Sequence, residues 1–440
     1  MNGPNAHPRK PDAGNLLAAV GLCLFFLMLF VPTSYKEIKA FLLAGLFFGI
    51  VLGLLYGVRF RIHIQVFVLS LFYAFLGMAY VFYGYVRGNP GAVRVSTVYV
   101  IWPIVYMVIL SAMSEERVFR GVARVLVWSS IAIPLYAIYY LFHELGFVPD
   151  ALYIELDLGQ SAGFYEDLVR YNLYSISSLL FLFPFVTASL LAWTGAGDFP
   201  VGRKTLVLAF VLTTCVSLLS GRRALWLVML LTPLLTSAVL YFVRERQGAI
   251  RKTIRPILYI ACVVGVSMGL LQTVFDVGIS GMLARLSEGF QFSDDLGAVL
   301  RREQYYALLA GWSESPFFGT GMGAVAEGSV RSLEMPWSYE LYFLSLLFHT
   351  GIVGIAAYAV GIGWIVFHGM RIVRRDPGLR MHMVPVLVAM ACFLIASNTN
   401  PYLGKFDYLW VVFLPVAIIN HSLLKRDFPG IPGKTAPDVR

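Results

Sequence analysis

The sequence predicts an all-α membrane protein of about twelve transmembrane helices, with a large helical loop between the ninth and tenth spans. Hydrophobic residues make up 58% of its 440 residues, aromatic residues 15% and charged residues only 13%. Soluble domains carry nearer a quarter of charged residues, so this chain lacks the polar surface that water requires. Its apolar residues also gather in runs of the length that a bilayer core demands, which is about twenty residues.

The apolar runs divide the chain into four parts. Nine spans and a loop at 144–172 lie in residues 1–275, a cap loop covers 276–340, three further spans lie within 341–424, and a tail covers 425–440. The predicted spans are 15–32, 38–57, 62–85, 96–113, 124–143, 173–193, 204–220, 224–243, 256–275, 341–368, 383–398 and 408–424.

The lysine and arginine residues predict the orientation. If the amino terminus is cytoplasmic, most basic clusters fall on the cytoplasmic side, as the positive-inside bias favours. We therefore expect both termini in the cytoplasm, and the net charge of +9 reflects topology and not a nucleic-acid partner. The cytoplasmic clusters are Arg9 and Lys10, Arg59 and Arg61, Arg117, Arg120 and Arg124, Arg203 and Lys204, residues 244–255, residues 371–380, and the tail from Lys425.

Several function classes lack their sequence signatures. Cys23, Cys215, Cys262 and Cys392 all lie in apolar runs without CxxC spacing, which indicates packing residues and not a disulfide or zinc framework. No HExxH motif and no Walker motif occur. We therefore expect no metal and no cofactor, and no ATP-driven transport by this chain alone.

Two predicted external segments, 144–172 and 276–340, are longer than simple connections need to be. Long loops without a span of their own are usually functional. The second contains a helix-like stretch at 300–312 and a glycine-rich turn at 319–323. The turn lacks the lysine and the strand–helix context of a phosphate loop, so we interpret it as a tight backbone turn within a folded cap.

Arginines on the external side are the first candidates for a site. Arg222 and Arg223 form a pair between the seventh and eighth spans, Arg301 and Arg302 form another in the cap loop, and Arg170 lies in the first loop. Guanidinium groups are planar, permanently charged donors that suit phosphate oxygens. Such arginines converging at the outer surface would bind a lipid-linked pyrophosphate. The alternative is that they pair with acidic residues of the same loops or with lipid headgroups.

Glu340 differs from the other external carboxylates. It follows the sequence Pro-Trp-Ser-Tyr at 336–339 and immediately precedes the apolar run of the tenth span. We therefore expect it to lie at the membrane interface and to be partly desolvated. A carboxylate in that place can serve as a general base. The alternative is a residue at a helix N-terminus that the helix dipole favours.

Three stretches resemble the bacterial O-antigen polymerase and O-antigen ligase superfamily. They are Ser-Gly-Arg-Arg-Ala-Leu-Trp at 220–226, the run from Arg301 through Tyr305 and Pro316 to the Gly-x-Gly-x-Gly of 319–323, and the segment 340–351 that begins with Glu340. The resemblance implies a GT-C-like membrane glycosyltransferase that needs no metal and acts on the periplasmic face of the inner membrane. Its donor is a glycan on undecaprenyl pyrophosphate, which the family's arginines hold; these map to Arg170, to Arg222 or Arg223, and to Arg301.

The resemblance leaves the acceptor open. The ligases carry His-Asn where this chain has Glu340 and Leu341, and a glutamate is more similar to the repeat-unit polymerases, whose acceptor is another lipid-linked repeat. We therefore expect an inverting polymerase of O-antigen or exopolysaccharide repeats, with a chain-length regulator as a possible partner. The alternatives are an O-antigen ligase, which uses lipid A–core as acceptor, and a transporter or flippase. Loop aromatics that would stack on sugars are Phe290, Phe292, Tyr305, Tyr306, Trp312 and Trp337. The alternative is that they pack inside the loop or line the membrane interface.

Overall fold

The computed structural model describes residues 13–55, 61–112, 116–159, 161–165, 168–193, 199–242, 265, 296–328 and 332–427. Within them, eight helices are long and apolar enough to cross a membrane. They are Ile64–Val86, Ala92–Ser111, Arg117–Glu144, Tyr174–Ala192, Arg223–Tyr241, Tyr342–Arg375, Pro377–Ala396 and Phe406–Asp427, and Leu16–Phe30 is a shorter apolar helix. The protein is therefore a helical protein built for a membrane.

Helices cover every predicted span except the ninth, 256–275, which lies outside the described residues apart from a helical residue 265. The count of twelve spans stays a prediction. The helices are α1 (Ala13–Phe30), α2 (Lys36–Leu55), α3 (Ile64–Val86), α4 (Ala92–Ser96), the π-helix η1 (Thr97–Ile101), α5 (Trp102–Ala112), α6 (Glu116–Glu144), α7 (Leu179–Ala192), α8 (Arg203–Leu219), α9 (Arg223–Tyr241), α12 (Leu296–Glu314), α13 (Tyr342–Arg375), α14 (Pro377–Ala396) and α15 (Trp410–Asp427).

Short elements connect these helices. In the first long loop, the strands β1 (Ser161–Tyr165) and β2 (Leu168–Asn172) pair as an antiparallel hairpin, which the sequence did not predict. The remaining elements are single 3₁₀ turns: η2 (Asp150–Leu152), η3 (Tyr174–Ser178), η4 (Tyr402–Gly404) and η5 (Phe406–Tyr408).

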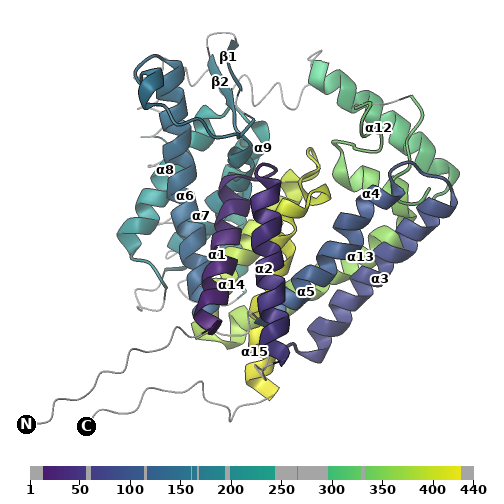
Figure 1. Ribbon diagram of the computed structural model, residues 1–440, viewed down its shortest axis with the longest axis horizontal. Coiled ribbons are helices and arrows are strands. Elements are labelled where there is room, and N and C mark those ends of the chain that lie inside the picture. Colours follow the sequence, from purple (N-terminus) through teal and green to yellow (C-terminus); the bar gives the residue numbers. More distant parts are fainter. Residues whose placement is uncertain are drawn as a thin grey trace, which may run out of the picture.

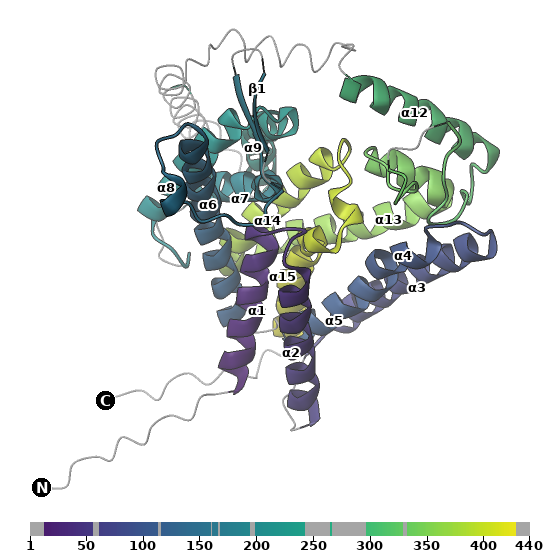
Figure 2. The ribbon, with the colours of Figure 1, turned by 45° about the horizontal axis from the view of Figure 1, so that its top comes forward.

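The helical bundle has two chemically different ends. The hairpin β1–β2 and helix α12 lie at one end, which we call the cap end, while α1 begins and α15 ends at the other (Figures 1 and 2). At that opposite end His63 Nε2 lies 2.8 Å from Asp427 Oδ2. Basic residues also close the helices there, as Arg374 and Arg375 do for α13 and Lys425 does for α15. This arrangement agrees with the predicted grouping of cytoplasmic basic residues.

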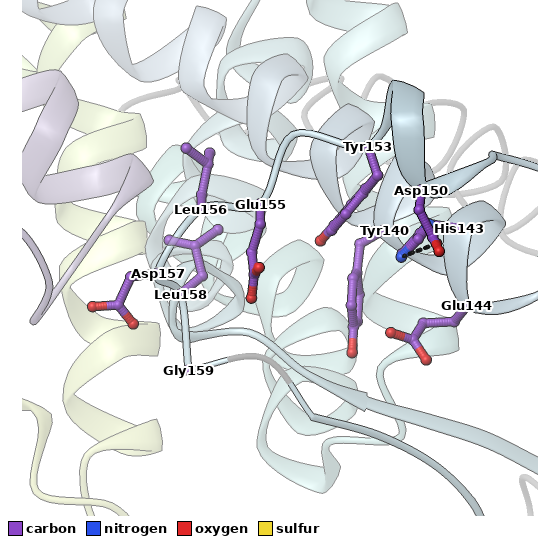
Figure 3. A pocket seen from close by; sticks show the side chains of 10 residues that line it. All are labelled: Tyr140, His143, Glu144, Asp150, Tyr153, Glu155, Leu156, Asp157, Leu158 and Gly159. Carbon is purple, nitrogen blue, oxygen red and sulfur yellow. Dashed lines mark ion pairs between the residues drawn. The ribbon is translucent and has the colours of Figure 1, made fainter.

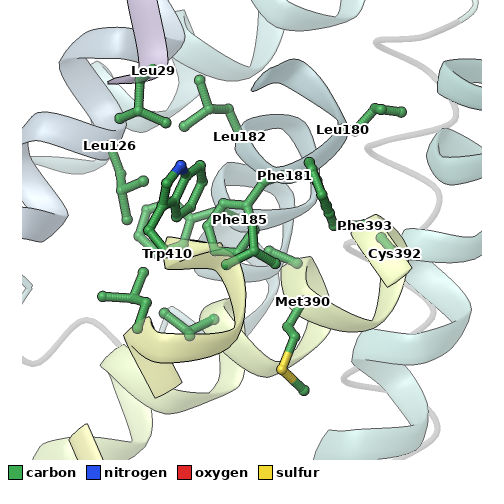
Figure 4. Packing of buried hydrophobic residues seen from close by; sticks show 14 of the residues in the cluster. Leu29, Leu126, Leu180, Phe181, Leu182, Phe185, Met390, Cys392, Phe393 and Trp410 are labelled. Carbon is green, nitrogen blue, oxygen red and sulfur yellow. The ribbon is translucent and has the colours of Figure 1, made fainter. Parts of the chain in front are cut away.

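Helices α7 and α14 form the centre of the bundle, and α9 packs against both. Almost every side chain of α7 is buried. Around it, Phe181 contacts Trp410 of α15 edge to face with ring centroids 4.7 Å apart, and Phe393 of α14 belongs to the same cluster (Figure 4). Truncating such a buried aromatic side chain to alanine costs about 3–5 kcal/mol, so this cluster fixes the arrangement of the helices that carry the cap end.

Helix α13 is broken at Gly351, whose backbone has φ 64° and ψ −170°. Residues 316–321, which follow α12, insert into this break. Two carbonyls before the break accept N–H groups of the inserted segment, and two N–H groups after the break donate to its carbonyls. The bonds run from Thr320 to Phe348 at 3.0 Å, from Gly321 to His349 at 2.9 Å, from Ile352 to Pro316 at 3.0 Å and from Val353 to Phe317 at 3.1 Å.

The glycine-rich turn at 319–323 is therefore a docking element, in keeping with the tight turn that the sequence predicts. Gly321 has φ +87°, and a Cβ atom there would lie 2.6 Å from Gly84 Cα of α3. Met322 donates its N–H to the Tyr80 carbonyl at 3.0 Å. Since a broken helix in a membrane must have its backbone groups satisfied by protein, the insertion both stabilises the break and holds the segment that follows α12 against α3 and α13.

Gly321→Ala is expected to loosen this docked turn. Alanine at positive φ is strained and its Cβ would collide with Gly84, so we expect a loss of at least about 1 kcal/mol of stability. Thermal unfolding of the detergent-solubilised protein would show a lower melting temperature. Gly363→Ala is the matched control, because nothing lies within 4 Å of a Cβ at that position of α13. Equal melting temperatures for the two variants would contradict the docking role.

Candidate functional site

Arg222 enters the site from the turn between α8 and α9. It precedes the first residue of α9, and its main-chain N–H donates to Ser220 Oγ at 3.3 Å. Its Nη2 donates to the Leu173 carbonyl at 3.3 Å, and its positive charge opposes the burial-driven rise in the pKa of the Tyr402 hydroxyl. The residue is half-buried between the segment after β2 and the η4 turn. The turn between the seventh and eighth predicted spans thus presents an arginine at the cap end.

Arg301 enters from the other side, on the second turn of α12. Its Nε lies 2.6 Å from Glu340 Oε2. Gln304, one helical turn further along, is 3% exposed, and its Oε1 accepts the N–H groups of Glu340 at 2.7 Å and of Leu341 at 3.2 Å. Residues three apart share one face of a helix, so α12 holds both the side chain and the backbone of Glu340.

Tyr402 of the η4 turn is affected by the charges of both Arg222 and Arg301. Burial raises the pKa of its hydroxyl, and the charge and hydrogen bond of Arg222, together with the charge of Arg301, counter part of that rise. Both guanidinium groups therefore act on one phenol group. Because the pKa lies above its ordinary value of 10.0, Tyr402 is protonated at neutral pH, and its hydroxyl can donate a hydrogen bond to an anion.

The structure separates the two members of each arginine pair. Arg223 and Arg302 are exposed, whereas Arg222 and Arg301 are half-buried and take part in the contacts above. Neighbouring residues on a helix point about 100° apart, so Arg302 cannot share the face through which α12 reaches Glu340. Arg170 lies in β2 opposite Gly163, and the position of its side chain lies outside the description. The site therefore contains Arg222, Arg301 and Glu340.

Glu340 lies immediately before α13, as the sequence predicts, and is 8% exposed. Arg301 and Glu340 neutralise one another in this ion pair. Glu340 is fixed by the α12 contacts, while the Arg301 side chain remains 39% exposed. A substrate can therefore reach the Arg301 side chain without breaking its ion pair with Glu340.

The segment of η4 and η5 that carries Tyr402 is held by a buried ion pair that the sequence did not reveal. Lys39 Nζ lies 2.6 Å from Asp407 Oδ1, with exposed fractions of 3% and 1%. Asp407 Oδ2 also accepts the N–H of Thr33 at 3.0 Å. Lys39 falls inside the predicted span 38–57, so that span is not free of buried charge. Removing one partner of such a pair costs about 3–5 kcal/mol because the other charge stays buried and unpaired, so the segment depends on both residues.

Tyr408 adds a second anchor, through a hydrogen bond between its hydroxyl and Ser177 Oγ. Sequence reasoning missed Tyr402, Gln304, Lys39 and Asp407. An aromatic residue before a span is common at membrane interfaces, so Tyr402 carries no signal of its own. Lys39 and Asp407 are single charges at the edges of apolar runs, which is a weak hint of a buried pair.

The loop aromatics occupy different environments. Tyr305 and Tyr306 of α12 are 46% and 63% exposed, and so are open to a ligand. Trp312 donates its Nε1–H to the Pro316 carbonyl at 3.1 Å, which is a structural contact. Phe290 and Phe292 lie outside the described residues. Only part of the predicted sugar-stacking set is therefore placed at an accessible surface.

A cavity of about 750 Å³ opens at the end of α6 (Figure 3). Its lining includes four carboxylates and no arginine, so it would repel a pyrophosphate and is not the site that the arginines form. Its wall is nevertheless connected to that site, because Tyr174 donates its N–H to the Leu158 carbonyl at 2.9 Å and Leu173 accepts from Arg222. The lining residues are Tyr140, His143, Glu144, Asp150, Tyr153, Glu155, Leu156, Asp157, Leu158 and Gly159.

Within the described residues, no group of three or more histidine, cysteine, aspartate or glutamate residues could hold a metal ion. The arrangement at the cap end instead offers two guanidinium groups and a phenol as donors, with a carboxylate beside them. Comparison with protein-family models and with curated proteins finds no match to this chain.

Proposed function

We propose that this protein is a periplasmic-face glycosyltransferase that polymerises repeat units carried on undecaprenyl pyrophosphate. The observation that carries the proposal is the ion pair of Arg301 with Glu340, 2.6 Å apart, at the same end of the bundle as the half-buried Arg222. The charges of both arginines also act on the pKa of Tyr402. Two permanently charged groups near one half-buried phenol form a site for a polyanion at the cap end. The resemblance to the O-antigen polymerases and ligases supplies the substrate class.

The donor pyrophosphate would lie between Arg222 and Arg301. Charge-assisted hydrogen bonds from guanidinium groups to phosphate oxygens are strong, and the Tyr402 hydroxyl adds a neutral donor. Helix α9 begins at Arg223, directly after Arg222, so its N-terminal N–H groups add partial positive charge. The polyprenyl chain then extends into the membrane beside the bundle, and the glycan extends into the periplasm.

The proposed reaction is a single displacement at the anomeric carbon of the donor glycan. The hydroxyl oxygen of the acceptor sugar forms the new bond to that carbon, while the bond from the carbon to the pyrophosphate oxygen breaks. The proton of the attacking hydroxyl passes to the Glu340 carboxylate. The bonding electron pair leaves with the pyrophosphate, whose growing charge Arg222 and Arg301 stabilise. One displacement inverts the anomeric configuration.

Glu340 suits the role of base because α12 fixes its position. The Arg301 contact orients the carboxylate, and Gln304 holds the backbone on both sides of it. The same Arg301 would bind the leaving pyrophosphate through its terminal nitrogens. The base and the leaving group are thereby kept close to one another, as a displacement on a bound donor requires.

Glycan analysis of a deletion strain separates the polymerase from the ligase. A polymerase deletion is expected to leave single repeats, both on undecaprenyl pyrophosphate and on the cell surface. A ligase deletion would strand long glycans on undecaprenyl pyrophosphate, and that result would reject the polymerase assignment. An unchanged glycan profile would reject both.

The transporter alternative is less well supported. Transporters place ionisable residues near the membrane midplane, where they bind their substrates. The buried pair of Lys39 and Asp407 joins the start of α2 to η5, next to the segment that carries Tyr402. Its contacts favour an anchoring role at the cap end over a place along a path through the bundle.

A further inference from the structure

A second hollow lies on the outer flank of α3. Its volume is about 370 Å³, and its lining consists of Ala79, Tyr80, Tyr83 and Phe318. The first three share one face of α3, and Phe318 belongs to the segment inserted into the break of α13. The hollow is therefore built by two elements that the docked turn holds together, since Tyr80 also accepts the Met322 N–H through its carbonyl at 3.0 Å.

The surroundings of this hollow are those of a lipid site. Phe318 is 62% exposed, and outward-facing side chains of α3, including Phe75 and Phe82, are also exposed and apolar. Ala79 to Tyr83 lie in the last two turns of a helix that ends at Val86, so the hollow is close to one membrane interface. An apolar surface at this depth faces the chains of lipids.

Arg87 gives the hollow a charged rim. It follows the last residue of α3, and its Cζ lies 5.3 Å from the centroid of the Tyr83 ring, which lines the hollow. The predicted orientation puts Arg87 on the external side, against the positive-inside bias, so topology does not explain this arginine. An apolar hollow with a guanidinium group at its outer end is complementary to a long hydrocarbon chain that ends in a phosphate.

We propose that this hollow binds the phosphorylated polyprenyl chain of the acceptor, the second lipid-linked repeat. The inference rests on the proposed function, because a repeat-unit polymerase must hold two such lipids at once. In the proposed function Arg222 and Arg301 bind the phosphates of the donor. The phosphates of the acceptor therefore need another cation, and Arg87 supplies it.

The route from the hollow to Glu340 supports the acceptor over the donor. The segment that carries Phe318 continues to Ala324 and Ala326, and the Tyr339 hydroxyl contacts both of these residues. Tyr339 is the neighbour of Glu340 in the chain. The segment that lines the hollow is therefore connected by direct contacts to the residue next to Glu340.

The first test measures binding and needs no turnover. Purified protein in nanodiscs would be labelled with a photoreactive undecaprenyl phosphate, with phosphatidylglycerol as competitor. Phe318→Ala and Arg87→Ser are each expected to reduce labelling on α3 about tenfold. The matched controls are Phe317→Ala and Arg94→Ser, which alter an exposed ring next to the lining and an exposed arginine on α4. The proposal would be overturned if the label appeared outside α3, or if phosphatidylglycerol competed for the hollow as well as undecaprenyl phosphate does.

The second test measures chain extension from a preformed long-chain donor to a labelled single-repeat acceptor. Phe318→Ala is expected to raise the KM for the acceptor about tenfold and to leave the KM for the donor unchanged. A rise in the donor KM, or no rise in either, would overturn the acceptor assignment. If the wild-type protein binds the polyprenyl phosphate at α3 but forms no polymer, the proposed function fails while the lipid site stands.

Discussion

Arg301→Ala is expected to reduce chain extension at least about 100-fold, because in the proposed reaction it removes a donor aimed at the charge that develops on the leaving pyrophosphate. The substitution also leaves Glu340, which is 8% exposed, without the guanidinium group 2.6 Å from its Oε2. Arg301→Lys should restore little of the loss, since a point charge does not replace a planar fork. The measurement is polymer length and rate in membranes that contain equal amounts of each variant.

The neighbouring residue provides the control for this prediction. Arg302 is exposed and lies on another face of α12, so Arg302→Ala should change the rate by less than about threefold. The same contrast applies in the turn before α9: Arg222→Ala should lower the rate of chain extension strongly, and Arg223→Ala should lower it only slightly. If both members of a pair have equal effects, the rate depends on the net charge at the cap end and not on the positions of Arg222 and Arg301.

Glu340→Gln is expected to lower the turnover number about 100- to 10,000-fold, which is the usual contribution of a general base. Glutamine keeps the size of the side chain and an oxygen that can accept from Arg301, so the fold of the cap end should survive. Donor binding should also survive, because the arginines stay in place. The turnover number must therefore fall with little change in the affinity for the donor.

Glu303→Gln is the matched control for the base. Glu303 is an exposed carboxylate on α12, two residues from Arg301, and it takes no part in the site. Its substitution should leave the turnover number unchanged. Polymer formation at the normal rate by Glu340→Gln would remove Glu340 from the chemistry and leave it as a structural partner of Arg301.

The helices were predictable because each span carries its own signal in about twenty consecutive residues. The grouping of basic residues at the end where α15 terminates followed from the same local pattern. The β1–β2 hairpin and the break in α13 were not predictable. Gly351 is a single glycine in an apolar run, and only the inserted segment 316–321, some thirty residues earlier, makes the break possible.

The candidate site was predictable only in part, for a related reason. The sequence identifies the pairs Arg222–Arg223 and Arg301–Arg302, but the choice within each pair depends on how α9 and α12 pack. Tyr402 lies about 100 residues from Arg301 and 180 from Arg222 in the chain, so no local pattern connects the three. Long-range packing alone brings them together.

Binding of undecaprenyl pyrophosphate to the purified protein in nanodiscs tests the central claim most directly. The affinities of the wild-type protein and of the single variants Arg222→Ala, Arg301→Ala, Arg223→Ala and Arg302→Ala would be compared. The structure predicts at least about tenfold weaker binding for Arg222→Ala and Arg301→Ala, and wild-type affinity for the other two. Equal binding by all four variants, or weakening confined to Arg223→Ala and Arg302→Ala, would contradict the claim that Arg222 and Arg301 hold the leaving group.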